Sequence, residues 1–132
     1  MIPTRDLNSS SHVSLREVFR LVSLDVDELK DDISEYKIID VRSYNEYDIS
    51  HISGATNIHT GYLENNLDKI SDGEKIVLYC TSGDRSAIAA SYLLKLGYRN
   101  IYNLSGGINA WIQAGCQTER KNVDQMVTTE SQ

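Results

Sequence analysis

A short apolar segment, a polar loop and an Ala- and Leu-rich segment follow one another in the middle of the chain, and this succession constrains the fold most. Residues 76–79 are apolar or aromatic and include β-branched side chains, which is typical of a buried strand. Residues 86–96 favour a helix, and Gly97 follows them as a helix-terminating glycine. The loop between them therefore joins the carboxyl end of a strand to the N-terminus of a helix, and Cys80 is its first residue.

The polar loop has the residue types of an anion-binding site. Unpaired backbone N–H groups and the positive end of the helix dipole favour an anion at a helix N-terminus. They would lower the pKa of the Cys80 thiol and make it a nucleophile near neutral pH. Gly83 allows a positive φ, with which successive N–H groups can turn inward, and Arg85 adds the only full positive charge of the loop.

An alternative is that Cys80 is a small buried hydrophobe, as many cysteines are. The residues after it do not favour this, because four of the next five are polar or charged and would be costly in a core. We therefore predict Cys80 as the catalytic nucleophile of a reactive-cysteine site. The following six residues are predicted to bind the substrate: Thr81, Ser82, Gly83, Asp84, Arg85 and Ser86.

The loop from Cys80 to Ser86 also resembles the active-site loop of the rhodanese family, whose members are sulfurtransferases. The family's N-terminal signature is similar to residues 40–47 with 51–58, and its C-terminal signature is similar to residues 103–111 with 114–115. These signatures have the family's order and approximate spacing, and the resemblance covers about residues 21–119. The sequence departs from the family at Ser50, where a glycine usually precedes the histidine, and at Asp84, an acid inside the anion-binding loop.

Segments typical of strands alternate with segments typical of helices along the chain. The predicted strands are residues 18–23, 37–41, 57–58, 76–79 and 100–103, and the predicted helices are residues 26–33, a short helix from Ser43, and residues 62–70, 86–96 and 108–114. Asp25 and Glu28 form a capping-box pattern ahead of the first helix. The alternation implies a three-layer α/β domain with a central parallel sheet and helices on both faces. The resemblance implies that this domain is rhodanese-like. Cys80 falls at the carboxyl edge of the sheet, where such folds bind ligands.

The length of 132 residues allows one domain. We place a flexible N-terminal tail at residues 1–14, the rhodanese-like domain at 15–119 and a flexible C-terminal tail at 120–132, within a polar and frayed segment that begins at Gln117. The net charge of −6 argues against nucleic acid and an anionic membrane surface as partners. No segment has the composition of a signal peptide or a membrane span, so we expect a cytoplasmic protein.

The resemblance implies a sulfur-transfer reaction. Cys80 would take a sulfane sulfur from a donor such as thiosulfate, hold it as a persulfide, and pass it to cyanide or a thiol, with a sulfur-accepting protein as a further candidate partner. Two other functions fit the same fold. A partner-binding module without activity would most simply have lost the cysteine, which this chain keeps. A phosphatase or arsenate reductase would need five residues between its cysteine and arginine to surround a tetrahedral oxyanion, whereas four separate Cys80 from Arg85.

Three other polar residues invite a catalytic interpretation, and a structural one is favoured for each. We expect His51 to be hydrogen-bonded and to position its loop through Ser53 and Gly54, because the resemblance points to activation of sulfur by the cysteine loop rather than by a Cys–His pair. Asp40 and Arg42 stand at the end of a predicted strand, where charged residues commonly pair with each other or cap loops. We therefore leave these three off the catalytic site.

The second cysteine and the single tryptophan are also interpreted as structural. Cys116 follows the last predicted helix without a polar loop of its own, and Trp111 is expected to anchor the core. Two cysteines do not make a disulfide framework, and their spacing with the three histidines shows no metal-ligand pattern. We expect neither a metal nor a cofactor.

Overall fold

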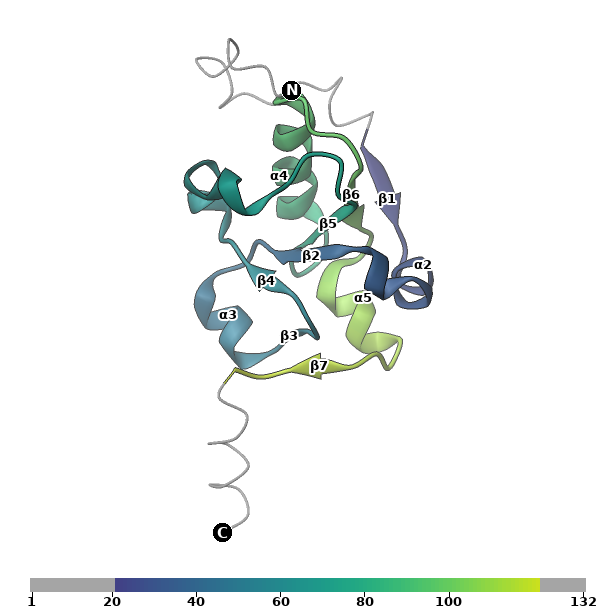
Figure 1. Cartoon of the computed structure of the whole chain (residues 1–132). Coiled ribbons are helices and arrows are strands. Elements are labelled where there is room, and N and C mark those ends of the chain that lie inside the picture. The colour runs from purple at the N-terminus through teal and green to yellow at the C-terminus, as the bar shows by residue number, and fades with distance from the viewer. Residues whose placement is uncertain (1–20, 122–132) are drawn as a thin grey trace.

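Five parallel strands form the central sheet of the protein (Figure 1). The computed structural model describes residues 21–121. The strands are β1 (Val22–Leu24), β2 (Lys37–Asp40), β4 (Thr56–Asn57), β5 (Ile76–Tyr79) and β6 (Ile101–Leu104). They lie in the order β1-β6-β5-β2-β4, and each neighbouring pair is parallel. The strand that leads to Cys80 is therefore the middle one, which places the cysteine at the centre of the carboxyl edge.

Alternate residues of the middle strand face two separate hydrophobic cores. Ile76 and Leu78 pack with one set of buried side chains, and Val77 and Tyr79 pack with another. All four residues are buried. Because successive side chains of a strand point to opposite faces, the sheet is covered on both sides.

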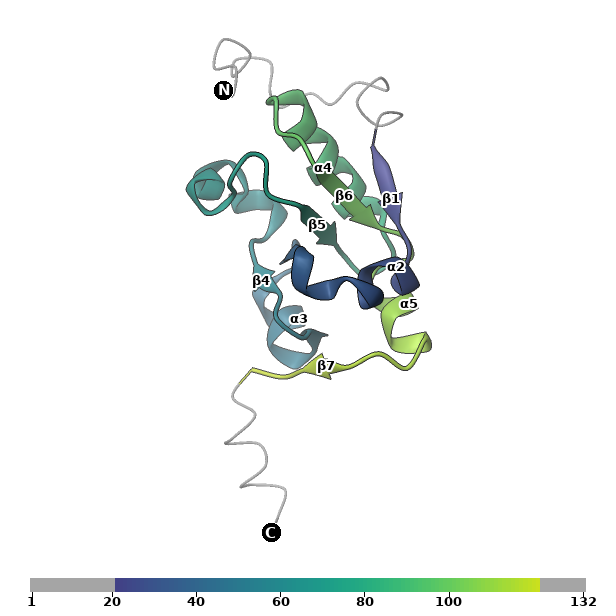
Figure 2. The ribbon, with the colours of Figure 1, turned by 45° about the vertical axis from the view of Figure 1, so that its right-hand side comes forward.

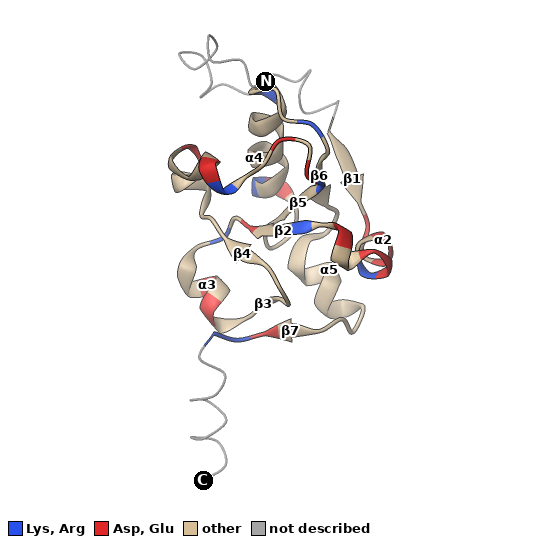
Figure 3. Cartoon of the chain, viewed as in Figure 1, with Lys and Arg blue, Asp and Glu red and all other residues tan. Residues whose placement is uncertain are grey.

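The helices of the described residues supply the two covering layers (Figures 1 and 2). One face carries α4 (Asp84–Lys95) with the short 3₁₀ helices η3 (Thr60–Tyr62) and η4 (Glu64–Lys69). The other carries α2 (Val26–Asp31), η2 (Ile33–Glu35) and α5 (Gly107–Gln113). A further helix, α3 (Tyr44–Ile49), follows β2. Acidic and basic residues are interspersed over these elements rather than gathered on one of them (Figure 3). The predicted three-layer α/β fold with a parallel sheet is confirmed.

Two helices begin with the same capping pattern. The Asp25 carboxylate accepts a hydrogen bond from the Glu28 amide at 2.8 Å, and the Glu28 carboxylate accepts one from the Asp25 amide at 2.9 Å, as predicted for the start of α2. Ser43 and Glu46 form a second capping box at the start of α3. This box fixes Glu46 in the first turn of α3, where it becomes part of the site described below.

The prediction of one helix over residues 62–70 is wrong. The chain forms η3 and η4 instead, and Asn66 leaves the helical region at φ −122° and ψ 23°. Its side-chain amide donates to the Tyr62 carbonyl oxygen at 2.7 Å, in competition with the backbone bonds of a regular helix. Leu63 and Ile70 are nevertheless buried.

A second, two-stranded sheet was not predicted. It pairs β3 (His51–Ile52) antiparallel with β7 (Thr118–Glu119). The expectation of a frayed segment from Gln117 is therefore wrong over these residues. The hydroxyl of Ser53 also donates to the Glu119 carboxylate at 2.7 Å. Strands of two residues are too short to show the alternation by which a strand is recognised.

The remaining boundaries lie close to their predicted places. α4 begins at Asp84 rather than at Ser86, and Gly97 follows it with φ 103°, in the left-handed conformation expected of a helix-terminating glycine. Residues 1–20 and 122–132 lie outside the described part of the chain. With them lie the predicted N-terminal tail, the first residues of the predicted strand 18–23 and most of the predicted C-terminal tail.

Candidate active site

The Cys80 sulfur lies among hydrogen-bond donors at the N-terminus of α4. Its Sγ accepts hydrogen bonds from the backbone amides of Gly83 at 3.1 Å and Ser86 at 3.4 Å, and the Ser86 hydroxyl oxygen lies 3.4 Å away. Gly83 has φ 110°, the left-handed conformation that turns successive N–H groups inward. Cys80 is only 1% exposed, so these donors rather than bulk water solvate the sulfur.

The same donors determine the charge state of the sulfur. Burial raises the pKa of the Cys80 thiol, but hydrogen bonds from the Ser86 hydroxyl and from the amides of Ser86, Gly83 and Ser82 outweigh it, and the net pKa is lowered. The thiolate, not the thiol, is the nucleophilic form of cysteine. The loop can therefore present a sulfur nucleophile at a lower pH than an ordinary cysteine.

The start of α5 supports the loop. The carbonyl oxygens of Cys80 and Thr81 accept hydrogen bonds from the amides of Ile108 at 2.9 Å and Asn109 at 3.1 Å. These bonds fix the peptide groups at the beginning of the loop. Gly107 lies beside them with φ 60°, and a Cβ atom there would collide with both carbonyl groups. The glycine is thus required by the close approach of α5 to the cysteine loop.

Asn103 of β6 was not predicted as a site residue, and it positions the Ser86 hydroxyl. Its Oδ1 lies 2.6 Å from the Ser86 Oγ, and its Nδ2 donates to the Gly83 carbonyl oxygen at 3.2 Å. Because Nδ2 is the donor toward Gly83, Oδ1 is the acceptor toward Ser86. The single hydroxyl proton of Ser86 therefore has three acceptors within reach, namely Asn103 Oδ1, the Cys80 sulfur and the Gly83 carbonyl oxygen at 3.3 Å. The sequence held one signal that could have identified Asn103: it is an amide in a segment that otherwise has the composition of a buried strand.

Arg85 lies at the rim of the loop, with its side chain 48% exposed. Its guanidinium donates to the Thr81 hydroxyl at 3.3 Å and lies 3.8 Å from the Glu46 carboxylate. Burial raises the pKa of Glu46. Hydrogen bonds from Ser43 and the charge of Arg85 lower it by more, so the net pKa is lowered. The acid is therefore charged and partly compensates the one cation of the loop, an arrangement that spacing along the chain did not predict.

The two other loop residues, Ser82 and Asp84, are exposed. Asp84 is the first residue of α4, and the dipole of a helix favours an acid in its first turn. This position gives a physical reason for the acid that departs from the family pattern. The described structure thus brings Cys80, Gly83 and Ser86 together at the sulfur, and leaves Thr81, Ser82, Asp84 and Arg85 around it.

Asp40 and Arg42 form a buried ion pair, as expected of them. The Arg42 guanidinium lies 2.7 Å from the Asp40 carboxylate, and the Tyr79 hydroxyl donates to the same carboxylate at 2.7 Å. Burial and then the charge of Asp40 raise the pKa of Tyr79, which keeps the phenol neutral and able to donate. The Tyr79 hydroxyl in turn accepts a hydrogen bond from the Ile52 amide at 3.0 Å. This network joins β2, β3 and β5 below the carboxyl edge.

His51 is hydrogen-bonded, but not through the residues expected. Its ring stacks on that of Tyr47 with centroids 3.8 Å apart, and its Nδ1 lies 2.7 Å from the Tyr47 carbonyl oxygen. Its Nε2 lies 3.6 Å from the Glu119 carboxylate. The expected contact with the segment at Ser53 and Gly54 is replaced by these bonds to α3 and β7. Among residues 21–121, His51 has no hydrogen bond to the cysteine loop.

Cys116 and Trp111 pack with the core on the face of α2 and α5. Trp111 is buried, as expected, and its indole N–H donates to the Gln117 carbonyl oxygen at 2.8 Å. Both described cysteines are free thiols. Within residues 21–121, no three His, Cys, Asp or Glu side chains are gathered so as to hold a metal ion. No helix in this part of the chain has the length and apolar character needed to cross a membrane.

A parallel sheet between two layers of helices, with an amide-lined cysteine loop at its carboxyl edge, defines a rhodanese-like domain. The comparison with protein families agrees, because the model of the Rhodanese-like domain matches residues 25–114. The chain therefore belongs to the rhodanese family.

Individual relatives place the chain more closely. An uncharacterized protein of Bacillus subtilis, YqhL, is 41% identical over 75 residues, which make up 57% of this chain and 60% of that protein. The thiosulfate sulfurtransferase GlpE of Shewanella oneidensis is 27% identical over 108 residues, 82% of this chain and 98% of that protein. A crystal structure of a rhodanese-like domain protein from Staphylococcus aureus has a TM-score of 0.69 and 31% identity, covering 77% of this chain and 100% of that one. The match to YqhL spans about three fifths of that protein's own length. The chain shares the fold of sulfur-transfer proteins.

Proposed function

We propose that the protein is a rhodanese-type sulfurtransferase, in which Cys80 carries a sulfane sulfur from a small donor to a thiol or cyanide. The observation that supports this most directly is the position of the buried Cys80 sulfur among the loop amides and the Ser86 hydroxyl. Donors arranged in this way stabilise a sulfur anion. The name of the Shewanella oneidensis relative, a thiosulfate sulfurtransferase, points to the same reaction.

In the first half-reaction, the Cys80 thiolate attacks the outer sulfur of thiosulfate. A bond forms between Sγ and this sulfur, the S–S bond of thiosulfate breaks, and its electron pair leaves with sulfite. The resulting persulfide carries its negative charge on the terminal sulfur, about 2 Å beyond Sγ. The amides of the loop and the Ser86 hydroxyl are the donors available to that charge.

In the second half-reaction, an acceptor thiolate or cyanide attacks the terminal sulfur. The bond between this sulfur and Sγ breaks, and its electron pair returns to Cys80 as the thiolate. The acceptor leaves as a persulfide or as thiocyanate, so the cycle needs no external oxidant or reductant. Two half-reactions through one covalent intermediate give ping-pong kinetics.

The geometry of the loop favours sulfur over a tetrahedral oxyanion. Four residues separate Cys80 from Arg85, and the amide donors converge at 3.1 and 3.4 Å on a single sulfur atom. Arg85, the group that would hold an oxyanion, lies at the rim and 3.8 Å from Glu46. We therefore do not propose a phosphatase or an arsenate reductase.

Intact-protein mass spectrometry tests the proposal. After incubation with thiosulfate, the protein is expected to gain the mass of one sulfur atom and to lose it again on addition of cyanide or glutathione. Cys116→Ser is the matched control and is expected to gain the same sulfur, whereas Cys80→Ser is expected to gain none. A wild-type protein that takes up no sulfur, and releases no more sulfite than Cys80→Ser does, would overturn the proposal in favour of a partner-binding module.

A further inference from the structure

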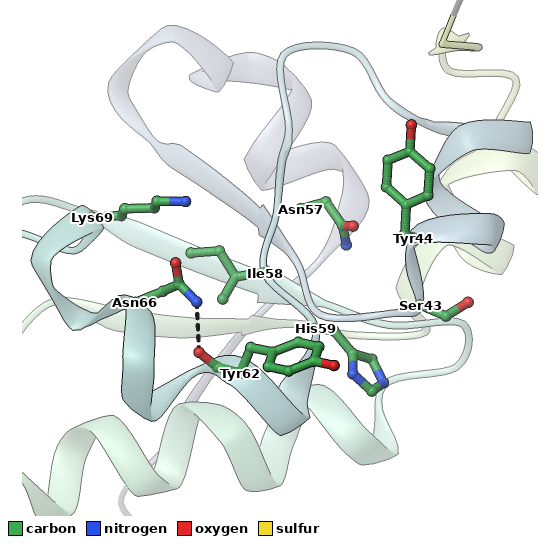
Figure 4. A pocket seen from close by; sticks show the side chains of 8 residues that line it. All are labelled: Ser43, Tyr44, Asn57, Ile58, His59, Tyr62, Asn66 and Lys69. Carbon is green, nitrogen blue, oxygen red and sulfur yellow. Dashed lines mark hydrogen bonds between the residues drawn. The ribbon is translucent and has the colours of Figure 1, made fainter.

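A cavity of about 400 Å³ lies beside the carboxyl end of β4 (Figure 4). Its walls come from α3, from the residues that end and follow β4, and from η3 and η4. The volume is that of a site for a small molecule. Nothing in the mechanism proposed above uses this cavity.

The cavity lies on the same edge of the sheet as Cys80. β4 neighbours β2, and β2 neighbours β5, whose end leads to Cys80. The carboxyl ends of parallel strands meet at one edge, and two strand spacings amount to about 10 Å. The two sites also share α3, because Ser43 lines the cavity and caps Glu46, the residue that pairs with Arg85.

Aromatic side chains on two sides of the cavity are at least half exposed. Tyr44 is 50% exposed and Tyr62 is 64% exposed, and the His59 ring lies beside Tyr62 with centroids 6.0 Å apart. In Figure 4, Tyr44 lies across the cavity from Tyr62 and His59. Large aromatic surfaces of this kind are usually buried in a core or used in binding.

The cavity is lined by one cationic side chain and no acidic one, although the chain as a whole carries a net charge of −6. Lys69 extends its ammonium group toward the middle of the cavity (Figure 4). Its side chain has no ion pair or hydrogen bond with any residue in the described part of the chain. A second lysine, Lys121, does not line the cavity, but its ammonium lies 4.9 Å from the centroid of the ring of Tyr44, which does. A ligand carboxylate can therefore pair with Lys69 without displacing a described partner.

We infer that this cavity binds the carboxylate-bearing part of a low-molecular-weight thiol or persulfide of about tripeptide size, while the sulfur of that molecule reaches Cys80. Three extended residues span about 10 Å, which matches two strand spacings. Thiosulfate is too small to occupy both places. The inference rests on the proposed function and specifies the class of its larger substrate.

Binding of S-methylglutathione tests the cavity without any sulfur transfer, because this tripeptide thioether has carboxylates but no reactive sulfur. Titration calorimetry with the full chain is expected to show saturable binding, weakened roughly fivefold in Lys69→Ala through the loss of one charged contact and restored in Lys69→Arg. Lys30→Ala is the matched control, since Lys30 lines a different cavity. Absence of saturable binding, or equal weakening in Lys69→Ala and Lys30→Ala, would overturn the inference.

A second measurement follows the discharge of sulfur-loaded Cys80 by two acceptors, glutathione and the uncharged 2-mercaptoethanol. The rate constant with glutathione, divided by the rate constant with 2-mercaptoethanol, is expected to fall roughly fivefold in Lys69→Ala and to stay unchanged in Lys30→Ala. An unchanged ratio in Lys69→Ala, with Cys80 still loading sulfur, overturns the inference and leaves the proposed function standing. If Cys80 takes up no sulfur, the proposed function fails, and the S-methylglutathione titration still decides whether the cavity binds a carboxylate ligand.

Discussion

A few atoms around one sulfur set the chemistry of this protein at the scale of the residue. The Gly83 and Ser86 amides approach Sγ at 3.1 and 3.4 Å, and Asn103 holds the Ser86 hydroxyl at 2.6 Å. At the rim, Glu46 lies 3.8 Å from Arg85. Two predictions follow from these contacts, one for the charge of the sulfur and one for the capture of an anionic donor.

The lowered pKa of Cys80 predicts the pH profile of its alkylation. The thiolate persists as the pH falls until the pKa is reached, so the rate with iodoacetamide should have its midpoint below about 8.5, the value of an ordinary cysteine. Ser86→Ala removes the hydroxyl and keeps the amide, and we expect it to raise the midpoint because one of the hydrogen bonds that lower the pKa of Cys80 is lost. Measurement in a Cys116→Ser background isolates Cys80. An unchanged midpoint in Ser86→Ala would show that the hydroxyl serves Asn103 alone.

The pairing of Glu46 with Arg85 predicts that Glu46→Gln improves the use of thiosulfate. The substitution removes the negative charge beside Arg85 and keeps an oxygen for the cap at Ser43. We expect the KM for thiosulfate to fall roughly two- to fivefold at low salt, the range of an exposed ion pair. The difference should shrink at high salt because the charges are then screened. A KM that rises, or does not change at any salt concentration, would contradict this role.

At the scale of the element, the cysteine loop depends on the N-terminus of a helix other than its own. The amides of Ile108 and Asn109 at the start of α5 bind the carbonyl oxygens of Cys80 and Thr81. The α5 helix approaches so closely that Gly107 has no room for a side chain. The loop is therefore held between α4, which supplies donors to the sulfur, and α5, which fixes the peptide groups at its beginning.

This close approach predicts that Gly107→Ala is strongly destabilising. The substitution adds the strain of a positive φ to a collision with two carbonyl groups, and we expect a loss of about 3 kcal/mol in the free energy of unfolding. Gly115→Ala is the matched control, because Gly115 has φ 78° and open space around it, and should cost about 1 kcal/mol. Urea denaturation measures both. An equal loss of unfolding free energy in the two variants would mean that the close contact of Gly107 with the cysteine loop does not contribute to stability.

At the scale of the whole molecule, the segment after α5 is bound to the main fold by two contacts. β7 pairs with β3, and the Gln117 carbonyl oxygen, just before β7, accepts the indole N–H of Trp111. Glu119 also binds Ser53 and lies near His51. Gln117 and β7 lie beyond residues 25–114, the part that matches the family model, yet they bind residues within it.

Truncation tests whether this last segment belongs to the folded unit. A chain that ends at Cys116 should be less stable than one that ends at Lys121 by about 1–3 kcal/mol, because the buried Trp111 N–H loses its acceptor and β3 loses its partner. Urea unfolding of the two shortened chains, side by side, measures the difference. Coincident unfolding curves would show that β7 adds nothing to the stability of the domain.

The sequence by itself determined the local part of this protein. The apolar run before Cys80, the glycine that turns the loop and the helix formers after it act on residues close in the chain, so their effect shows in a short pattern. The capping box at Asp25 and the alternation that implies a parallel sheet are local in the same sense. The loop from Cys80 to Ser86, with the two further signatures at residues 40–58 and 103–115 in the family's order, then indicated the rhodanese family.

Only the tertiary structure decided which distant residues meet. Asn103 at Ser86, Glu46 at Arg85, Gly107 at the cysteine loop and Lys69 in the cavity beside β4 all join segments from different elements. The same holds for the pairing of β3 with β7 and for Asn66, whose amide divides a predicted helix in two. Such contacts depend on strand order and helix packing, which leave no periodic signal in a single sequence. The cysteine loop could therefore be located from the chain, whereas the distant residues that surround it and the cavity beside β4 could not.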